Sequence, residues 1–527
     1  MYLNKITQYL NRHIVGNVYD QPAILSAYSA DHSILHAMPR FVAVPENTAD
    51  IQFLLRFVSS FAKKKLKLPV AIRGSGLDKT GAAISNGLII STENLSQIQE
   101  IDEHSRLVRV QSGVTLESLN NFLKSHGLTI PIKAQPNATI GGLIAGFNAD
   151  PFASKYGSIY KFVDRIEAVL PNGEIFQSVS LNRRGLKRLD SLGSTESKIY
   201  QSIYDLLQEN SDLIQELTDS TPSFSGYHMV TRVQDSHRGF DLLPLFFASC
   251  GTLAVITEVI IRCVPLPRPD RTAFFEFESI RPALAASKTL FKLNPISVDL
   301  IDNRILKNST TNGKTFPFEQ EINSRGYTIS AKFNSHPFIF KHQMRKLAKI
   351  PARQSLISEP NESTNLLDSV LLNYLNSDPI KRRYPLVDNV LIEPDRFSDF
   401  SADLFKLETS IGQSLPIYGS LATNLYSVRP AFNISNPLDR RNMLNFLQKY
   451  AKTVSDHRGA LAGGADGRLK AAFSNRQFNP REKELYQTIK QIFDPANILN
   501  PDAKLGSDLK KIVRQLRSDS PNHIILP

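Results

Sequence analysis

The chain has 527 residues, of which 41% are hydrophobic and 21% are charged, and its formal net charge is +12. This composition excludes a disordered or fibrous chain, and the length predicts two or three domains, because one hydrophobic core does not grow to this size. The basic residues are dispersed except at residues 63–65 and 510–517, so the charge does not indicate a nucleic-acid-binding surface.

Residues 1–35 are predicted to form a helical segment, the N-terminal lead-in. Polar residues such as Lys5, Gln8 and Arg12 interrupt its apolar positions, so it does not resemble a signal peptide. No stretch of about 18 consecutive apolar residues occurs later in the chain, which argues against a membrane-spanning helix. We therefore expect a cytoplasmic protein. Weak peripheral contact of the basic tail with the inner face of an acidic membrane stays open as an alternative.

Short strands and helices alternate from residue 36 to about residue 180. A helix is predicted to begin at Thr48 as the capping residue, because Ile51, Leu54 and Val58 repeat at helical spacing. Strands are predicted at residues 68–72, 87–92, 107–111, 165–170 and 174–177. The last two are joined by an Asn-Gly pair at residues 172–173, which tolerates positive φ and predicts a β-hairpin.

Three glycine-containing segments lie beside predicted strands. They are residues 73–81, residues 138–146 with a Tyr-Gly pair at 156–157, and residues 249–258. Glycines in such segments let backbone N–H groups converge on an anion such as a pyrophosphate. Each segment taken alone also fits a plain turn or a core strand, and the first lacks the spacing of the dinucleotide fingerprint.

The second half of the chain predicts a separate domain. Residues 181–245 read as a mixed helical insertion, a strand follows at residues 253–263, and Pro265, Pro267 and Pro269 form a stiff connector. A cap or substrate domain is therefore expected at residues 269–410. A closing segment at residues 411–506 contains a helix with Tyr486 and Ile489 on one face, and residues 507–527 form a basic tail.

The order of these segments resembles a known family. An Arg-Gly-x-Gly loop, a Thr-Ile-Gly-Gly segment, a Tyr-Gly pair, a Val-x-Pro-Asn-Gly hairpin and a Gly-Thr-Leu strand follow one another here. The FAD-binding domain of the vanillyl-alcohol oxidase and para-cresol methylhydroxylase (PCMH) type has the same order. The resemblance covers about residues 20–506. It implies an α+β fold, with a two-part FAD-binding domain at residues 36–268 under an α+β cap.

The resemblance also implies FAD as the cofactor, held by the three glycine-containing segments and the closing segment. The residues expected to contact it are Arg73, Gly74, Ser75, Gly76, Leu77, Thr139, Gly141, Gly142, Tyr156, Gly251, Thr252, Val255 and Asn500. Covalent members of the family carry a histidine where this chain has Leu77. We therefore expect FAD to be bound non-covalently.

The chain departs from the family's 2-hydroxy-acid dehydrogenases at their metal site. D-lactate and 2-hydroxyglutarate dehydrogenases bind a divalent metal through histidines and an acid in two segments of the closing region. This chain has Ser420, Ser427, Gly464 and Ala465 at the matching places. Serine hydroxyls and alanine cannot replace imidazole as ligands. No metal site is therefore expected.

Four residues remain as candidates for handling substrate. Arg429 and Arg468 are suited to a carboxylate, Tyr426 offers a hydroxyl, and His228 offers an imidazole base. Each also fits an ordinary structural role, as an ion-paired arginine or a packed histidine.

The sequence thus predicts a FAD-dependent oxidoreductase acting on CH–OH donors, similar to D-lactate, glycolate and 2-hydroxyglutarate dehydrogenases. Its partners would be a small 2-hydroxy acid or related alcohol and an unidentified electron acceptor, with no nucleic acid. One alternative is a flavin-binding protein that has lost catalysis together with the metal site. A second is a basic surface-binding protein whose glycine loops are only turns.

Overall fold

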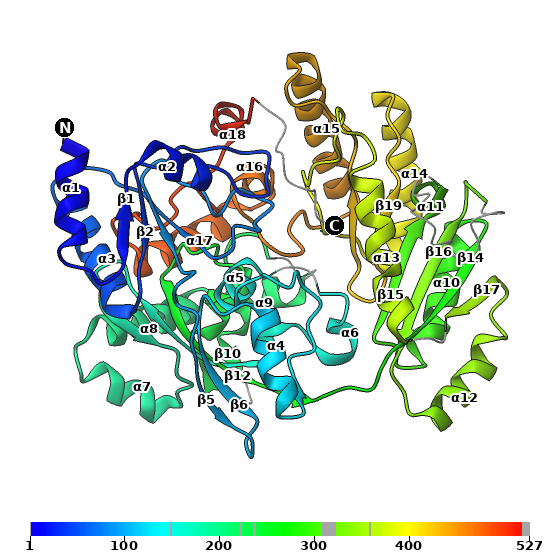
Figure 1. Cartoon of the computed structure of the whole chain (residues 1–527), viewed down its shortest axis with the longest axis horizontal. Coiled ribbons are helices and arrows are strands. Elements are labelled where there is room, and N and C mark those ends of the chain that lie inside the picture. Colours follow the sequence, from blue (N-terminus) through cyan, green and yellow to red (C-terminus); the bar gives the residue numbers. More distant parts are fainter. Residues whose placement is uncertain are drawn as a thin grey trace.

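The computed structural model describes residues 2–147, 150–220, 224–235, 239–307, 323–357 and 360–518. Figure 1 shows two lobes joined side by side. The N-terminal half of the chain builds the first lobe, and the second is the cap. The chain then returns to the first lobe for its last helices.

A four-stranded sheet carries the first glycine-containing segment. Its strands are β1 (Asn17–Tyr19), β2 (Phe41–Val44), β4 (Leu88–Ser91) and β3 (Val70–Arg73), in that spatial order. The last three are parallel, and β1 pairs antiparallel with β2 at the edge. The N-terminal lead-in therefore contributes a strand as well as its helices, α1 (Tyr2–Asn11) and α2 (Pro22–Tyr28).

Helix α3 (Thr48–Lys63) connects β2 to β3 and buries the predicted stripe of Ile51, Leu54 and Val58. Its N-cap, however, is Asn47 and not Thr48, because the Asn47 side chain accepts the Asp50 N–H at 3.0 Å. The Asp50 carboxylate in turn accepts the backbone N–H of Gly16 at 2.8 Å. A buried carboxylate thus joins the lead-in to the start of this helix.

A five-stranded antiparallel sheet forms the second part of the first lobe. Its order is β5 (Ile98–Asp102), β6 (Leu107–Gln111), β12 (Val255–Arg262), β8 (Val163–Val169) and β9 (Ile175–Gln177). The predicted hairpin is confirmed, since β8 and β9 pair antiparallel and Gly173 has a φ of +81°. Helices α4 (Leu116–Ser125) and α5 (Ile140–Gly146) lie beside this sheet.

The insertion at residues 181–245 is mostly helical where the structure describes it, with one short antiparallel strand pair, β10 (Gln234–Asp235) and β11 (Gly239–Phe240). It contains α7 (Arg183–Asp190), α8 (Thr195–Glu209), α9 (Ser211–Asp219) and the 3-10 turns η2 (His228–Arg232) and η3 (Leu243–Phe246). Its apolar residues share one core with α17 (Pro480–Phe493). Both cysteines are buried and free, as expected.

The cap is built on a seven-stranded antiparallel sheet. Its order is β17 (Arg353–Ile357), β14 (Arg271–Phe277), β16 (Tyr327–Phe333), β15 (Ser297–Asp302), β19 (Ile417–Ser420), β20 (Leu425–Val428) and β18 (Val390–Leu391). The cap helices are α10 (Ile280–Phe291), α11 (Asn303–Lys307), α12 (Pro337–Leu347), α13 (Pro360–Leu375), α14 (Pro394–Ile411) and α15 (Pro437–Asp456). The remaining short elements are β7 (Leu128–Thr129), β13 (Val264–Pro265), α6 (Ala153–Tyr156) and η1 (Ile159–Lys161).

The structure divides the segment at residues 411–506 between the two lobes. Strands β19 and β20 and helix α15 belong to the cap, where Met443 and Phe446 are buried. Helix α17 returns to the first lobe, where Tyr486 and Ile489 are buried. Helical spacing predicts a buried face, but it does not say which of two cores will bury it.

The predicted basic tail begins with an ordered helix, α18 (Leu509–Gln515). Its Ile512 is buried, and Leu516 forms a β-bridge with Leu35. Residues 519–527 of the predicted tail lie outside the described residues. No helix within the described ranges has both the length and the apolar character needed to cross a membrane.

Candidate functional site

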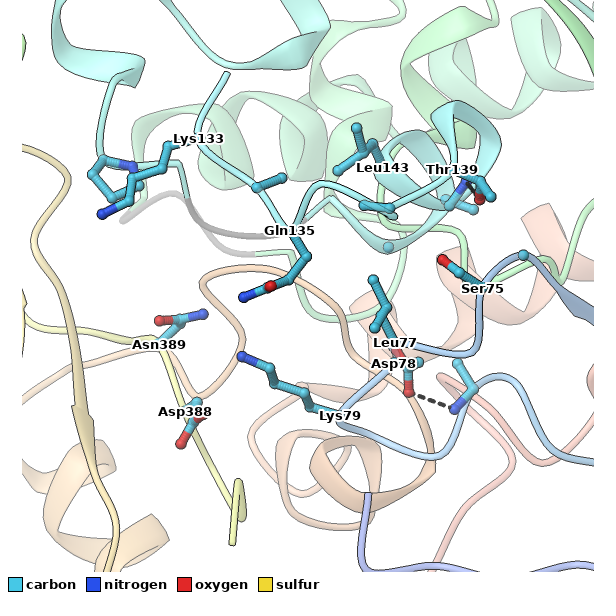
Figure 2. A pocket seen from close by; sticks show the side chains of 18 of the residues that line it. Ser75, Leu77, Asp78, Lys79, Lys133, Gln135, Thr139, Leu143, Asp388 and Asn389 are labelled. Carbon is cyan, nitrogen blue, oxygen red and sulfur yellow. Dashed lines mark hydrogen bonds between the residues drawn. The ribbon is translucent and has the colours of Figure 1, made fainter. Parts of the chain in front are cut away.

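A cavity of about 730 Å³ lies between the first lobe and the cap. All three glycine-containing segments contribute to its wall on the first lobe. The opposite wall comes from β15, β19, β20 and the residues just before β18. Figure 2 shows side chains from both sides converging on this space. The cavity therefore lies between the glycine-containing segments of the first lobe and the sheet of the cap.

The first glycine-containing segment is packed too closely for side chains at two positions. A Cβ atom on Gly74 would lie 2.1 Å from Thr139 Oγ1, and one on Gly76 would lie 2.3 Å from the Arg73 guanidinium. Gly76 also has a φ of +73°, a conformation that glycine adopts without strain. Gly74, Ser75, Gly76 and Leu77 all line the cavity. Their backbone can thus approach a ligand directly.

Arg73 supports this loop and is not among the cavity-lining residues. Its Nη1 donates to the Ala30 carbonyl at 2.8 Å, and its guanidinium lies 5.2 Å from the centre of the Tyr28 ring. The arginine therefore fixes the loop from behind, in a role different from the predicted cofactor contact.

The second and third segments complete the wall of the first lobe. Thr139 caps α5 by accepting the Gly142 N–H at 3.2 Å, and a Cβ on Gly141 would come within 2.9 Å of Ser112 Cβ. Thr139, Gly141, Gly142 and Gly251 line the cavity. Close backbone packing at several glycines gives a surface that a flat ring or a phosphate could contact without obstruction.

The other predicted cofactor residues hold the wall in place without lining it. Asn500 Nδ2 donates to the Ala82 and Cys250 carbonyls at 2.7 and 2.8 Å. Thr252 bonds the Tyr227 hydroxyl at 2.7 Å, and Val255 lies in the apolar core. Tyr156 accepts a hydrogen bond from Asn334 of the cap at 2.5 Å. These contacts tie the glycine-containing segments to one another and to the cap.

Arg429 is the one catalytic candidate that the structure places in the cavity wall. Its guanidinium is 1% exposed and forms a two-point ion pair with Asp388, with Nε 3.1 and 2.9 Å from the carboxylate oxygens. Burial alone would lower the pKa of Arg429, but Asp388 outweighs this effect and raises it. The arginine therefore stays charged, and the Asp388 carboxylate neutralises most of this charge.

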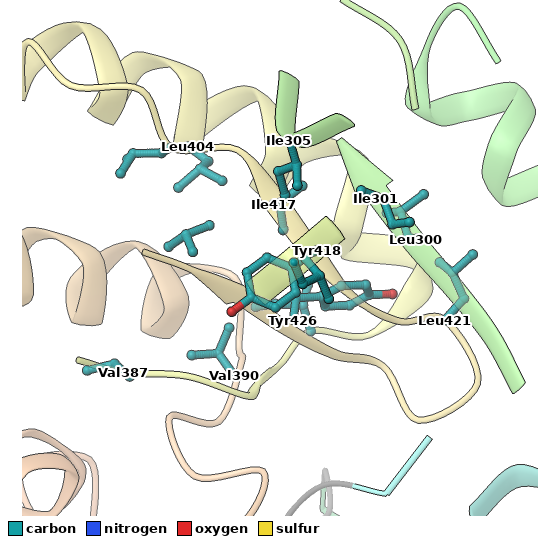
Figure 3. Close-up of a cluster of buried hydrophobic side chains, with 14 of the residues drawn as sticks. Leu300, Ile301, Ile305, Val387, Val390, Leu404, Ile417, Tyr418, Leu421 and Tyr426 are labelled. Carbon is teal, nitrogen blue, oxygen red and sulfur yellow. The ribbon is translucent and has the colours of Figure 1, made fainter. Parts of the chain in front are cut away.

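The other three candidates, Tyr426, Arg468 and His228, do not line the cavity. Tyr426 packs in the cap core (Figure 3). The centre of its ring lies 4.2 Å from that of Phe397. Alternate residues of a strand face opposite sides, so Leu425 and Ser427 of β20 line the cavity and Tyr426 cannot. On β19 it is Tyr418 that faces the cavity.

The surroundings of Arg468 and His228 also give both residues a structural role that does not involve a substrate. Arg468 is buried and donates to the Gly81 carbonyl and, at 2.8 Å, to Asn500. His228 does not line the cavity, and burial lowers its pKa to about 4. It is therefore neutral at physiological pH, next to Arg232.

Sequence reasoning missed several polar side chains that line the cavity. Lys79 belongs to the loop at residues 73–81, where only residues 73–77 were expected to contact the cofactor. Lys133 and Gln135 precede the second segment, and Asp388 and Asn389 come from the cap. A lysine inside a glycine-rich loop is a signal that could have been used. The cap residues carry no recognisable pattern.

Ser420 and Ser427, which the sequence analysis matched to metal-binding histidines, both line the cavity. Ser427 Oγ accepts the Asn389 N–H at 3.0 Å. In the part of the chain that the structure describes, Ser420 Oγ, Thr423 Oγ1 and Ser112 Oγ are buried without a hydrogen-bond partner. Buried polar atoms are normally paired with protein groups or ordered water, so these three are available to bond water or a polar ligand in the cavity.

No three His, Cys, Asp or Glu side chains of the described residues are grouped as metal ligands. The expectation of a metal-independent site rests on the residues that replace the histidines, and it stays a prediction.

The fold and this site define the class of protein. Two solved structures share the fold: p-cresol methylhydroxylase with substrate bound, and 4-ethylphenol oxidase from Gulosibacter chungangensis, each with a TM-score of 0.67. They are 13% and 12% identical to the chain, which covers 97% of each and is itself covered to 96% and 97%. The chain therefore has the two-part α+β FAD-binding fold of the PCMH type under a cap.

Comparison with family models shows which domains the chain contains. Residues 39–178 match the FAD binding domain, and residues 381–503 match the C-terminal domain of FAD linked oxidases. The chain thus contains both of the domains that these two models describe, and FAD is its cofactor. The predicted family, fold class and cofactor are confirmed.

Curated relatives include dehydrogenases of 2-hydroxy acids. D-2-hydroxyglutarate dehydrogenase of Haemophilus influenzae is 23% identical over 97% of this chain and 53% of its own length. D-lactate dehydrogenase of Archaeoglobus fulgidus is 24% identical over 93% of this chain and 96% of its own. The chain spans about half the length of the D-2-hydroxyglutarate dehydrogenases that it matches.

Purified protein is expected to release its FAD on mild acid or heat treatment. Leu77, which lines the cavity at the place of the covalent histidine, offers no nucleophile for a bond to the flavin. The measurement is flavin fluorescence in the supernatant after the protein is precipitated. Flavin that stays with the pellet would contradict non-covalent binding.

Proposed function

We propose that this chain is a FAD-dependent oxidoreductase that oxidises a small 2-hydroxy acid, such as D-lactate, or a related alcohol. The observation that carries the proposal is the shared cavity, which has glycine-lined backbone on one wall and polar side chains of the cap on the other. Bound FAD would supply the hydride-accepting chemistry. The protein's own residues then have to bind the substrate, orient it and exclude water.

The polar wall of the cap is suited to a substrate with a hydroxyl and a carboxylate. Tyr418 and Ser420 on β19, Ser427 on β20, and Asn389 before β18 face the cavity. They offer hydroxyl and amide groups that can bond a substrate hydroxyl. Apolar neighbours such as Leu300 and Leu371 complete the wall and limit the access of water. This arrangement supports binding of one small polar molecule against the cofactor.

A flavin-binding protein that has lost catalysis is the second candidate. It is favoured by Ser420 and Ser427, which occupy the places of metal-binding histidines. Anaerobic mixing of the flavoprotein with D-lactate, D-2-hydroxyglutarate, glycolate and sugar alcohols separates the two candidates. Loss of flavin absorbance with at least one donor is expected. An oxidised flavin with every donor would favour the second candidate, and the same assay with dyes as oxidants would characterise the acceptor.

Turnover is expected to need no divalent metal. The replaced positions offer serine hydroxyls, and neutral oxygens bind transition metals weakly without imidazole or several carboxylates. The donor found in the flavin assay would be tested with and without a chelator, alongside elemental analysis of the protein. Activity that a chelator abolishes and zinc or manganese restores would show that other residues have rebuilt the site.

A further inference from the structure

Helix α12 of the cap exposes two large apolar side chains at its start. Phe338 is 82% exposed and Ile339 is 56% exposed, whereas Gln343 and Leu347 on the opposite side of the helix are buried. The Phe338 ring stacks on the ring of His336, the residue that caps the helix, but this contact leaves most of Phe338 in solvent. Single exposed apolar residues are common. Two neighbours on one face of a helix call for a further explanation.

The other exposed side chains of α12 that follow this apolar pair are all basic. Helical spacing places them on the same side of the helix as the pair. Together they form a surface that we call the α12 face: Phe338, Ile339, Lys341, His342, Arg345 and Lys346. The helix dipole favours cations in the last turn, which explains Arg345 and Lys346 but not Lys341 or the apolar pair. None of these three cations forms an ion pair with another of the described residues.

The segments around the α12 face carry cations without carboxylates. From Arg325 to Arg353 the chain has seven Lys or Arg residues and no Asp or Glu. Residues 279–298, which contain α10, also have no Asp or Glu. The side chain of Gln343 donates to the Leu293 carbonyl at 2.6 Å, so α12 lies beside the end of α10, where Lys292 is exposed. The sequence hides this cluster, because buried residues separate the cations along the chain.

The carboxylates that flank these segments are directed to other groups. Glu276 on β14 lies 3.6 Å from Arg353. Burial lowers the pKa of Lys332 on β16, and Asp270 is one of the carboxylates that oppose this effect. Glu278 precedes α10, at the end opposite α12 and about 18 Å away along the helix. The acidic residues named here therefore leave the charge of the α12 face in place.

We propose that the α12 face is a docking surface for a membrane that contains anionic lipids. Its cations complement anionic headgroups, and each one near the membrane surface contributes about fivefold in affinity. Phe338 and Ile339 can enter the boundary between headgroups and acyl chains, as the apolar residues of interfacial helices do. A second copy of the chain would bring like charges together across a twofold axis. A nucleic acid would bind the cations but leave the apolar pair in water.

The proposed surface is separate from the flavin site. The structure describes α12 in full, and none of its residues lines the cavity. Figure 1 shows α12 at the outer edge of the cap, away from the first lobe. Docking through the α12 face would therefore leave the cavity unobstructed, whether or not the flavin is reduced by a 2-hydroxy acid.

The test measures vesicle binding by the FAD-loaded, full-length chain. The protein is sedimented with vesicles of phosphatidylglycerol and phosphatidylcholine, and with vesicles of phosphatidylcholine alone. Binding to the acidic vesicles is expected at low salt, with release at about 1 M salt, where charges are screened beyond about 3 Å. Failure to bind the acidic vesicles at low salt, or equal binding to both kinds of vesicle, would overturn the proposal.

Two variants test the α12 face itself. Lys341→Gln combined with Arg345→Gln and Lys346→Gln is expected to weaken binding to acidic vesicles by about 100-fold, at about fivefold per cation. Phe338→Ser is expected to weaken it by about 10-fold, because the gain from burying part of a phenylalanine is lost. These residues are exposed, so flavin content and the free energy of unfolding should match the wild type. Unchanged vesicle affinity in both variants would overturn the proposal.

Matched controls come from two other helices. Arg183→Gln combined with Lys187→Gln and Arg188→Gln removes the same number of exposed charges from α7 in the first lobe. Phe405→Ser removes a phenylalanine of α14 that is 64% exposed. Both controls should bind acidic vesicles nearly as tightly as the wild type. Losses as large as those of the α12 variants would mean that no particular face docks. Binding of a DNA duplex without binding of vesicles would assign the cations to nucleic acid. Either result would overturn the proposal.

Discussion

Replacing Gly76 with valine is expected to give a folded protein with little or no bound FAD. The new Cβ would meet the Arg73 guanidinium at 2.3 Å, in a residue with a φ of +73°. Either the Arg73 guanidinium must leave its bond to the Ala30 carbonyl or the loop itself must move, and this loop is a part of the cavity wall that exposes its backbone. The measurement is the flavin absorbance relative to the protein absorbance after purification, followed by titration of the apoprotein with FAD.

Gly127→Val is the matched control for this experiment. Gly127 also has positive φ, +66°, but a Cβ there would meet nothing within 4 Å, and the residue does not line the cavity. Both variants bear the cost of a side chain in the left-handed region, about 1–2 kcal/mol. Only Gly76→Val should lose the flavin. Equal FAD content in the two variants would show that the loop does not contact the cofactor.

Asp388→Ala is expected to destabilise the protein by about 3–5 kcal/mol, because it leaves the charge of Arg429 buried without its partner. Arg429 is 1% exposed and Asp388 is 6% exposed, so water cannot replace the lost carboxylate. The pair joins the segment before β18 to the end of β20. The measurement is the free energy of unfolding in urea, with the fluorescence of the tyrosines in the cap as the signal.

The reason for the destabilisation can be checked with a second change. Asp388→Leu combined with Arg429→Met removes both charges and should recover most of the lost stability, since a buried pair adds little over apolar residues of similar size. Asp456→Ala breaks the exposed pair with Lys452 and should cost less than about 1 kcal/mol. A double variant as unstable as Asp388→Ala would mean that packing, and not charge, explains the loss.

Much of the first lobe could be predicted because its signals are local. Helical spacing identified the buried stripe of α3, and the Asn-Gly pair identified the β8–β9 hairpin. The glycines of the first segment were given a functional role from their neighbours in sequence, and the structure places Gly74 and Gly76 at the cavity. The resemblance to FAD-linked oxidases extended these local patterns to a fold and a cofactor.

The substrate side of the site was harder to predict, because it depends on strand register. Tyr418 and Tyr426 lie on the neighbouring strands β19 and β20. Both tyrosines belong to the buried cluster of the cap (Figure 3), but alternation along the antiparallel strands leaves only Tyr418 also lining the cavity. The residues of two short strands do not by themselves indicate which face of the sheet lies against the other lobe. Arg468 and Asn500 similarly bond each other behind the wall.

The sequence by itself determined the FAD-binding fold. It also predicted non-covalent binding of FAD at Leu77 and a site without metal-binding histidines, because turns, glycine loops and missing ligands are properties of neighbouring residues. Only the tertiary structure decided which polar groups share the cavity. Lys79 meets Asp388 and Arg429 because the cap folds over the glycine loop, bringing together segments far apart in the chain. Electrostatic effects depend on distance and burial, and both are set by that packing.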